Sequence, residues 1–569
     1  MHARYPMKTT IIVRLASLSL FLILPLSGVL HASAPKPNII VILADDMGWG
    51  NIGCFGGPID TPNLDRMASS GTRFTQFYTY PRCCPTRAML MTGLHPHEVG
   101  IGHMTFRRRG KNPSILEDRM KVPAAYRGWI RETIPTLPEM LRAAGYGTYM
   151  AGKWHVGNSD PATWPSNRGF DKFYGFIDGT SEYYKPADMR RGVEKIQVKG
   201  DRYYTTDAFT DEAIGFIQGH SKHKPGSPFF LYLAYNAPHF PMEAMPEDFK
   251  KYRGRFKEGW DALRVRTMAR QKELDLLPGN TVLSARSGDM HRLGTQPGPV
   301  PAWDDLTTKQ KDDMDAIMAT YAAMVDRMDQ NIGRLTRFLQ ESGQLDNTMI
   351  VFFSDNGAEA ESPPLGEFEA ANLGKYGNED HHYYYGRAWA NASNAPFREF
   401  KHFTYQGGVM SPLIVSWPQG MPNAMRGALV REFSFLPDVV ETCLDVGGAK
   451  HPAVIEGRTD RKYDGRSLRP LLEKGRTGSR GPVCVEHEGN RLVREGRWKL
   501  VSYFEEPWEL YDIDADPTEQ VDVARGHADV VTRLSAAYDE WAARVGARPW
   551  REAQDYSVYP PDSRHGARR

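Results

Sequence analysis

One run of residues indicates the architecture of this chain most directly: Asn38-Ile39-Ile40-Val41-Ile42-Leu43-Ala44-Asp45-Asp46. Seven residues without a charge, most of them aliphatic, are typical of a strand that is buried on both faces of a parallel sheet. Asp45 and Asp46 follow where this strand is expected to end. Ligands of parallel α/β sheets bind beyond the carboxyl ends of the strands, so these two acids are candidate functional residues.

The same arrangement recurs further along the chain. A helix is predicted from Thr136 to Ala144, with Thr136 as its cap and Gly145 as its stop. It leads into a predicted strand, Tyr146 to Ala151, and Lys153 and His155 lie just past the end of that strand. A second buried element therefore delivers polar side chains beyond its carboxyl end.

Two further apolar runs follow this pattern. The strand-like stretch Pro228 to Tyr235 precedes His239, and the stretch Met349 to Phe353 precedes Asp355 and Asn356. Alternating strands and helices predict an α/β sandwich with a large, mainly parallel sheet flanked by helices. Four strands would then place candidate functional side chains at one edge of the sheet.

The longest helical pattern runs from about Thr307 to Glu341 and ends near Gly343. Its methionine-rich apolar stripe has helical spacing, which predicts a core helix. The segment from Ser362 to Asn394 has no regular period and is interpreted as a long loop near the active edge.

The C-terminal part has a different composition. Residues 465–482 are rich in Arg, Gly and Lys, and short alternating runs follow at 483–485, 491–494 and 498–503. These runs predict antiparallel strands, and a last helix is predicted near His527 to Val545. We therefore expect a catalytic domain over 35–480 and a smaller α+β subdomain over 481–569.

The N-terminal segment is predicted to be a signal peptide over residues 1–34. Basic residues precede the apolar run Leu15 to Leu30, and the small residues Ala32-Ser33-Ala34 follow it. Pro25 interrupts the apolar run and no stop-transfer pattern follows, so no stable membrane span is expected. The protein is expected to be exported, to a periplasm or as a secreted protein.

Charge and cysteine content exclude several classes of function. The chain has 71 Lys and Arg against 69 Asp and Glu, a net charge of +2, so no nucleic-acid partner is expected. Its five cysteines, spread over 569 residues, cannot form a disulfide framework, although one bridge is compatible with them.

Two of the cysteines stand in a distinctive run, Cys83-Cys84-Pro85-Thr86-Arg87, which is closed by Thr92-Gly93. Pro85 suits the first turn of a helix, and the apolar residues 88–91 continue the helical pattern. Cys83 would then stand at a helix N-terminus, where backbone N–H groups favour an anion, with Arg87 one turn further on. The alternative is a disulfide cysteine beside a buried thiol.

This run resembles the C-x-P-[ST]-R signature of the formylglycine-dependent (type I) sulfatases, in the arylsulfatase A-like branch of the alkaline phosphatase superfamily. The resemblance extends from Pro37 to the last helix and keeps every motif in order. It implies an alkaline-phosphatase-like fold. It also implies that a formylglycine-generating enzyme oxidises Cys83 to an aldehyde, whose hydrate attacks the sulfur of a sulfate ester.

A metal site is expected from Asp45, Asp46, Asp355 and Asn356. Their hard oxygen ligands suit Ca²⁺ or Mg²⁺ better than zinc, although either pair taken separately could instead cap a helix. The resemblance assigns all four, together with the modified side chain at Cys83, to one divalent cation. Calcium is the expected ion and magnesium the alternative.

The resemblance also assigns the catalytic residues Arg87, Lys153, His155, His239 and Lys401. Arg87, Lys153 and Lys401 would supply positive charge, His239 and Lys401 would protonate the departing alcohol, and His155 would act as a base. One departure concerns Lys401: the family usually has Glu before the paired glycines, and this chain has Gln406. His402 is a neighbouring candidate for the role of Lys401.

Taken together, these features predict a sulfuric ester hydrolase that acts on an aryl sulfate or a sulfated carbohydrate. Two alternatives stay open at this point. One is a formylglycine-dependent phosphonate or phosphodiester hydrolase, and the other is a non-catalytic binder of sulfated glycans. The tyrosines Tyr183, Tyr184, Tyr383 and Tyr385 could stack on a substrate ring or be ordinary wall and core residues.

Overall fold

The computed structural model describes residues 1–2, 35–105, 121–199, 202–288, 298–366, 384–457, 459 and 461–554. From Lys36 onward the described residues form one compact unit. Residues 3–34 of the predicted signal peptide lie outside the described residues. Within the described ranges, no helix combines the length and the apolar character that crossing a bilayer requires.

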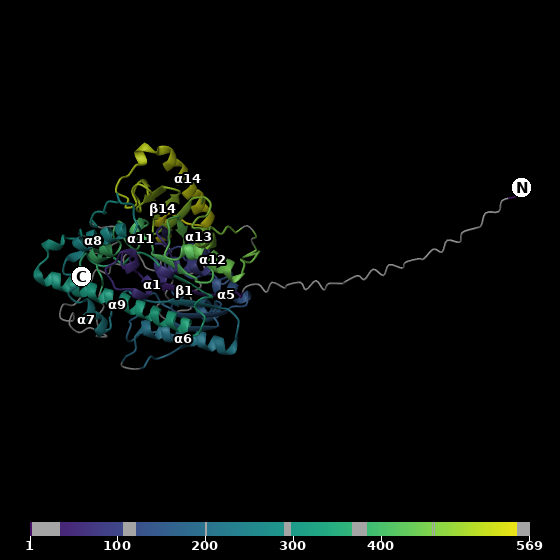
Figure 1. Cartoon of the computed structure of the whole chain (residues 1–569). Coiled ribbons are helices and arrows are strands. Elements are labelled where there is room, and N and C mark those ends of the chain that lie inside the picture. Colours follow the sequence, from purple (N-terminus) through teal and green to yellow (C-terminus); the bar gives the residue numbers. More distant parts are fainter. Residues whose placement is uncertain are drawn as a thin grey trace. The chain divides into compact units, whose positions relative to one another are not determined.

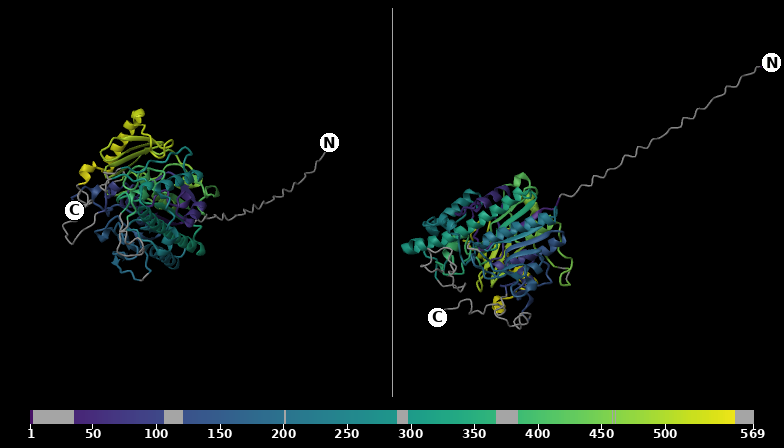
Figure 2. Two further views of the ribbon diagram at one scale, coloured as in Figure 1. Left: turned by 90° about the vertical axis from the view of Figure 1, so that its left-hand side faces the viewer. Right: turned by 90° about the horizontal axis from the view of Figure 1, so that it is seen from below.

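A ten-stranded sheet organises the described part of the chain (Figures 1 and 2). In spatial order its strands are β11 (Leu429–Val430), β2 (Thr72–Phe74), β10 (Leu413–Ser416), β9 (Thr348–Ser354), β1 (Asn38–Ala44), β8 (Phe229–Ala234), β4 (Gly147–Lys153), β5 (Lys172–Phe176), β6 (Met189–Arg191) and β7 (Glu194–Lys195). The five strands from β9 to β5 run parallel, whereas β10 and β6 join them antiparallel. The predicted mainly parallel sheet is confirmed.

The first predicted strand, β1, lies at the centre of this sheet. Its residues from Ile39 onward are fully buried, as expected for a strand covered on both faces. Ala44 is in register with Ser354 of β9, and Leu43 with Ala234 of β8. Because the three strands end at the same level, the polar residues that follow them come together.

The end of β4 differs from the prediction by two residues. Lys153 is the last residue of the strand and not a residue beyond it. The strand extends this far because Gly152, at φ +119°, allows close approach to β8: a Cβ there would lie 1.8 Å from the carbonyl oxygen of Ala234.

Helices pack against the sheet in two groups. One contains α1 (Pro62–Ser70), α6 (Thr205–His223), α7 (Pro246–Tyr252) and α9 (Thr308–Glu341), and the other contains α2 (Cys83–Thr92), α5 (Leu137–Ala143) and α12 (Pro437–Gly447). The remaining helices are α3 (Pro96–Val99), α8 (Gly259–Glu273), α10 (Arg387–Ser393), α11 (Gln406–Val409), α13 (Arg469–Lys474), α14 (Ala528–Val545) and α15 (Trp550–Ala553). The predicted core helix α9 is confirmed: Thr307 caps it, and its methionine stripe is buried.

The prediction of a continuous loop from Ser362 to Asn394 is wrong at its end. Residues 387–393 form the helix α10, and every residue of this helix is buried. A helix of seven residues that is covered on all sides has no polar face, so its sequence shows no amphipathic period. Residues 367–383 lie outside the described residues.

The C-terminal strands form a separate antiparallel sheet of β13 (Val483–His487), β14 (Asn490–Glu495), β15 (Trp498–Ser502) and β16 (Glu509–Asp512). Helix α14 packs on β14 and β15, and Figure 1 shows it beside them in yellow. Val493, Leu500 and Leu534 belong to the small core of this unit. A short parallel pair, β3 (Phe77–Tyr78) and β12 (Ser434–Phe435), completes the described strands. The boundary near residue 480 stays a prediction.

Candidate active site

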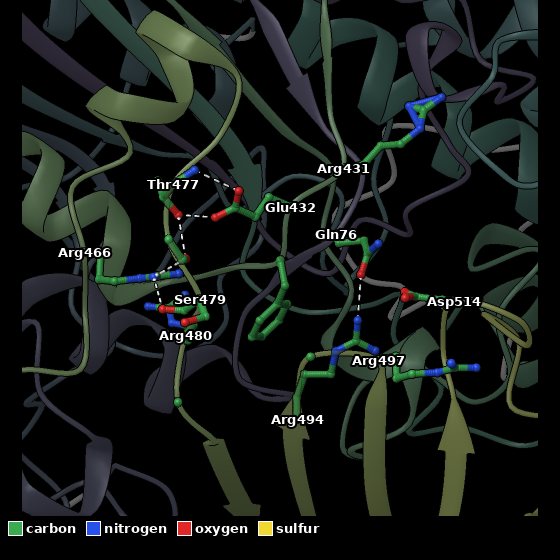
Figure 3. A pocket seen from close by; sticks show the side chains of 14 residues that line it. Gln76, Arg431, Glu432, Arg466, Thr477, Ser479, Arg480, Arg494, Arg497 and Asp514 are labelled. Atoms are coloured by element: carbon green, nitrogen blue, oxygen red, sulfur yellow. Dashed lines mark hydrogen bonds between the residues drawn. The ribbon is translucent and has the colours of Figure 1, made fainter.

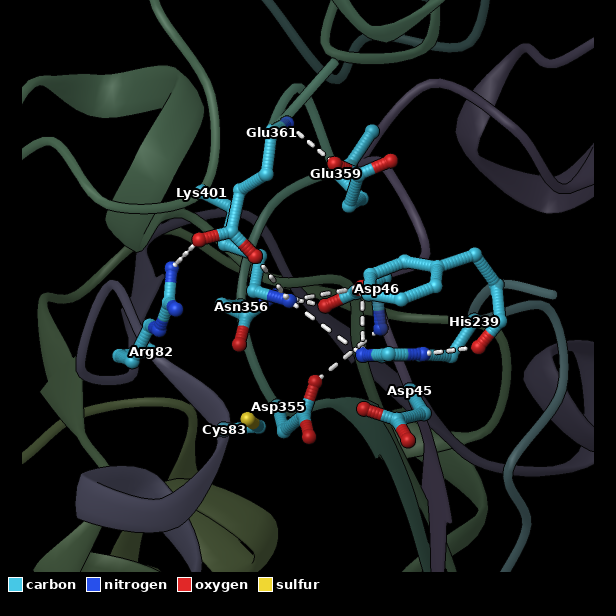
Figure 4. Close-up of polar contacts among 12 residues, drawn as sticks. Asp45, Asp46, Arg82, Cys83, His239, Asp355, Asn356, Glu359, Glu361 and Lys401 are labelled. Carbon is cyan, nitrogen blue, oxygen red and sulfur yellow. Dashed lines mark hydrogen bonds and ion pairs between the residues drawn. The ribbon is translucent and has the colours of Figure 1, made fainter. Parts of the chain in front are cut away.

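The strand order determines the order of the polar groups at the carboxyl edge. From β9 to β4, the neighbouring strands β9, β1, β8 and β4 lead in turn to Asp355, Asp45, His239 and Lys153. Residues that are separated by more than three hundred positions in the chain therefore become neighbours. Figure 4 shows most of this cluster, with Cys83 beside Asp355.

Four of the five predicted metal ligands, Asp45, Asp46, Asp355 and Asn356, lie together and are buried. The backbone N–H of Asp46 donates to Oδ1 of Asp355 at 3.1 Å, and Nδ2 of Asn356 donates to Oδ1 of Asp46 at 2.7 Å. Asp46 adopts a left-handed φ of +66°, which is uncommon for a residue other than glycine and turns the chain sharply after β1. The two acidic pairs thus form one polar centre.

The donor set fits a hard divalent cation. Asn356 Oδ1 is buried and has no hydrogen-bond partner among the described residues, and Asp45 Oδ1 likewise accepts no hydrogen bond there. Buried oxygens without partners are costly unless an ion or water binds them. Carboxylate and amide oxygens of this kind are the ligands that Ca²⁺ and Mg²⁺ prefer.

Arg87 holds the acids from the side of α2. Its Nε and Nη2 donate to Oδ2 of Asp355 at 3.1 and 2.9 Å, and Nη2 lies 3.4 Å from Oδ1 of Asp45. Nη1 donates to the carbonyl of Lys153 at 3.1 Å. The guanidinium is fully buried, so it acts as a fixed charge that positions two of the predicted ligands.

Two lysines each form an ion pair with one of the adjacent acids. Lys153 Nζ lies 2.5 Å from Oδ2 of Asp45, and Lys401 Nζ lies 2.9 Å from Oδ2 of Asp46. Lys401 Nζ is also 3.5 Å from Nε2 of His239. Nδ1 of His239 donates to the carbonyl of Phe240 at 2.6 Å, so Nε2 is left as the acceptor that faces Lys401.

Cys83 begins helix α2, as the sequence predicts, and its thiol is buried. Sγ lies 3.4 Å from Nδ1 of His155, a residue with a left-handed φ of +58°. Thr86, one turn into the same helix, donates its hydroxyl to the carbonyl of Asp355 at 2.7 Å. All five cysteines are free thiols, so the disulfide alternative for Cys83 is wrong.

Charge crowding perturbs the ionisation of this cluster. Burial opposes the charge of Asp45, but Lys153, His239 and Arg87 together hold the pKa of its carboxyl well below the ordinary value. For Asp355 burial prevails, and with the neighbouring charge of Asp45 it raises the pKa well above the ordinary value. Such opposed shifts within one buried cluster are typical of functional sites.

Lys401, not His402, reaches the acidic centre. His402 points toward the C-terminal sheet, where its Nδ1 lies 3.6 Å from Oε2 of Glu488. The departure at Gln406 also has a structural context. Gln406 starts α11, its side-chain oxygen accepts a hydrogen bond from the hydroxyl of Tyr78, and Lys499 Nζ lies 3.4 Å away. The exchange of Glu for Gln therefore concerns a buried interface and leaves Lys401 in place.

Sequence reasoning missed three charged residues at this site. Arg82 forms an ion pair with Glu361, and Oε2 of Glu361 lies 3.5 Å from Lys401 Nζ. Burial, with the nearby charge of Glu361, raises the pKa of Glu359 to about 8. The available signal was proximity in sequence, because Arg82 precedes Cys83 and the two glutamates follow Asn356 within five residues.

A pocket of about 330 Å³ opens beside His239. Phe240 and Tyr384 line it with their rings 4.8 Å apart, and the ring of Phe240 lies 4.3 Å from that of His239. By contrast, Tyr183 and Tyr385 are core residues, and Tyr383 lies outside the described residues. An aromatic wall next to a candidate proton-transfer residue can hold a sugar or aryl ring.

A second pocket, of about 390 Å³, is rich in arginine (Figure 3). Protein groups already engage several of these side chains: Arg480 pairs with Asp438, and Arg466 donates to the carbonyls of Gly478 and Ser479. The described residues that line it include neither cysteine nor histidine. The polar centre near Cys83 is therefore the better candidate for catalysis.

Comparison with known proteins agrees with this geometry. The family model described as "Sulfatase" matches residues 37–449, and the model described as "N-sulphoglucosamine sulphohydrolase, C-terminal" matches residues 399–542. The chain therefore belongs to the sulfatase family. It is a type I sulfatase of the alkaline phosphatase superfamily, an enzyme that hydrolyses sulfate esters.

Individual relatives extend over most of the chain. An uncharacterized sulfatase of Schizosaccharomyces pombe is 33% identical, covering 91% of this chain and 95% of the relative. An arylsulfatase of Klebsiella aerogenes is also 33% identical, covering 69% and 83%. Among solved structures, Ps i-CgsB in complex with k-i-k-neocarrahexaose superimposes with a TM-score of 0.63 at 25% identity, covering 92% of this chain and 94% of that chain.

Proposed function

We propose that this sulfatase uses formylglycine formed from Cys83 and one divalent cation, Ca²⁺ with Mg²⁺ as the alternative. The observation that carries the proposal is the convergence of Cys83, Arg87 and both acidic pairs in one buried centre. The thiol of Cys83 marks the place of the aldehyde hydrate, whose hydroxyl would be the nucleophile toward sulfur. Asp45, Asp46, Asp355 and Asn356, with the side chain at position 83, would hold the cation, which supplies positive charge at the sulfate oxygens.

The residues around this centre would bind the sulfate group and align the acidic side chains. A sulfate ester repels anionic nucleophiles, so Lys153 and Lys401 would bind its oxygens and lower that repulsion. Arg87 would keep Asp355 and Asp45 aligned through its fixed fork. These groups are buried and already in place, so little reorganisation is needed when charge develops on the reacting group.

Proton transfer would use the two histidines. His155 lies 3.4 Å from Sγ of Cys83 and would take a proton from the side chain at that position. Lys401 contacts Nε2 of His239 at 3.5 Å, and this pair would deliver a proton to the departing alcohol. Burial lowers the pKa of His155, so its imidazole is neutral and can accept a proton.

We further propose that the leaving group is an aryl or sugar ring that occupies the pocket beside His239. The aromatic pair Phe240 and Tyr384 supports a ring-binding role. The arylsulfatase relative and the solved structure with a bound neocarrahexaose support the two substrate classes, aryl sulfate and sulfated glycan.

This proposal also includes an export signal over residues 1–34, a catalytic domain over 35–480 and a C-terminal subdomain over 481–569. A formylglycine-generating enzyme is the proposed maturation partner. The composition of the N-terminal segment supports export to a periplasm or secretion. Mass spectrometry of the mature N-terminus would test the cleavage of this segment.

Mass spectrometry of the peptide that carries Cys83 is the decisive test. The protein should be produced with and without a co-expressed formylglycine-generating enzyme, and the aldehyde should be present only in the first preparation. Hydrolysis of an aryl sulfate should follow the aldehyde content. An unmodified thiol in a fully active preparation would contradict the proposal, and a faster hydrolysis of an aryl phosphodiester would favour a phosphorus substrate.

A further inference from the structure

A second group of histidine and carboxylate side chains lies outside the active site. His402, His487 and Glu488 each offer one possible ligand atom, and these atoms all lie within 4.8 Å of one another. His402 belongs to the loop that carries Lys401. His487 ends β13, and Glu488 stands in the turn between β13 and β14. All three residues are buried.

His487 is the unusual member of this group. Its exposed fraction is 0%, and neither of its ring nitrogens has a hydrogen-bond partner among the described residues. Burying an imidazole without partners costs free energy, and buried polar groups are normally satisfied by protein, water or an ion. Oε1 of Glu488 lies 3.7 Å from Nε2. This contact is too long for a hydrogen bond.

The spacing of the three ligand atoms suits a small transition-metal ion. Oε2 of Glu488 lies 3.6 Å from Nδ1 of His402, and Oε1 lies 3.7 Å from Nε2 of His487. Ligand atoms of a tetrahedral zinc ion lie about 2.0 to 2.2 Å from the metal and therefore about 3.3 to 3.6 Å from one another. The three ligand atoms all lie within 4.8 Å of one another, so the side chains would draw together when the ion binds.

His103 supplies the outer contact that such sites commonly have. Its Nε2 lies 2.6 Å from Oε1 of Glu488, so the imidazole N–H donates to the carboxylate and orients it. Its ring is stacked on that of His487, with the centroids 6.1 Å apart. Partners of this kind hold a ligating carboxylate in position and raise metal affinity.

We propose that His402, His487 and Glu488 bind one divalent transition-metal ion of the zinc class, separate from the active-site cation. Two imidazole nitrogens and one carboxylate oxygen are a donor set that zinc takes with water in its fourth position, whereas the active site offers mainly hard oxygens. The bound ion ties the turn between β13 and β14 to the loop next to Lys401. Its role is structural, because the C-terminal sheet then braces the loop from which Lys401 reaches Asp46.

The test measures zinc directly and does not depend on formylglycine. The full chain, loaded with Ca²⁺, is equilibrated with zinc chloride and desalted, and bound zinc is counted per chain by elemental analysis. We expect one zinc ion per wild-type chain and a higher thermal unfolding midpoint when zinc is present. The Asp355→Asn variant disrupts the active-site ligands and should keep both properties.

The His487→Phe variant removes the ligand but keeps an apolar ring in its place. Zinc affinity should fall more than about 100-fold, and zinc should no longer raise the unfolding midpoint. The matched control is His97→Gln, since His97 is also buried and contacts Glu486 of the same strand at 2.9 Å, but lies outside the cluster. This control should retain zinc.

Two results would overturn the proposal. One is wild-type protein that binds no more zinc than His487→Phe. The other is zinc that is lost in Asp355→Asn but kept in His487→Phe, which would place the ion in the active site. A His487→Phe protein that is as stable as the wild type without zinc would show that the variant folds, so its loss of zinc could not be attributed to misfolding.

Discussion

Breaking the buried ion pair of Lys499 and Glu519 should weaken the attachment of the C-terminal sheet. Lys499 lies in β15, and its Nζ is 2.6 Å from Oε1 of Glu519, with both side chains fully buried. Oε2 of Glu519 accepts the backbone N–H of Gln406 at 2.8 Å. Burial lowers the pKa of Lys499 to about 8 although the charge of Glu519 opposes this shift. The charge of Lys499 therefore depends on Glu519.

The expected change in the free energy of unfolding follows from the contacts that a variant would lose. Lys499→Met leaves a buried carboxylate with one backbone donor, which should cost about 3 to 5 kcal/mol. The double variant Lys499→Met with Glu519→Gln removes both charges and keeps the acceptor for Gln406, so it should recover to within about 1 to 2 kcal/mol of the wild type. The loss in the double variant should therefore be smaller than the sum of the losses in the two single variants.

Thermal unfolding measures this effect and also tests the proposed domain boundary. With an unfolding entropy of about 2.1 cal/mol/K per residue, a loss of 4 kcal/mol lowers the midpoint by about 4 °C if residues 36–569 unfold together. The same loss lowers it by about 20 °C if residues 481–569 unfold by themselves. Lys309→Met is the control, because Lys309 is 69% exposed in its pair with Asp313 and should change stability by under about 0.5 kcal/mol.

The reasoning would be refuted by a Lys499→Met variant that is no less stable than the Lys309→Met control. It would also be refuted if the double variant were as unstable as the sum of the two single variants, since the charges would then not be coupled.

Three further outcomes are expected. Arg87→Lys keeps a charge but loses the fork on Asp355, so kcat/KM on an aryl sulfate should fall by about 10²- to 10³-fold; a value within threefold of the wild type would contradict this role. Glu243→Gln should remove a pH dependence of stability, because burial raises the pKa of Glu243 from 4.5 to about 7. Between these two values the folded state binds more protons than the unfolded state. The wild type should therefore lose about 3 kcal/mol of stability relative to the variant as pH rises from 4.5 to 7. A difference in the free energy of unfolding between wild type and variant that is the same at pH 5 and pH 8, measured by urea unfolding, would disprove this. Removal of divalent cations with a chelator should abolish sulfatase activity and lower the unfolding midpoint, and Ca²⁺ should restore the activity and part of the midpoint; full activity in a preparation free of divalent cations would exclude the proposed site.

Much of the fold could be predicted because its signals are local. An aliphatic run without polar residues requires a covered strand, and this applies to β1 and β9 wherever they lie in the chain. The polar residues after those strands were predictable for the same reason, since parallel strands of one sheet end at one edge. Helix α10 was not predictable, because a short helix that is buried all round leaves no period in the sequence.

The missed parts of the site depend on contacts between distant segments. Glu361 is an ordinary loop glutamate in the sequence, and only the fold brings it to Arg82 and Lys401. Likewise His402 precedes His487 by 85 positions, so no motif spacing connects them. Their contact exists because the turn after β13 packs against the loop that follows α10.

The register between β1 and β9 has a consequence for folding. A slip of one residue would move Asp355 by about 3.3 Å and turn it to the other face of the sheet, while most backbone pairing would survive. A misaligned molecule would thus resemble the native one by circular dichroism yet bind the active-site cation poorly. Calcium affinity should therefore report on correct strand alignment during refolding more sensitively than secondary-structure content does.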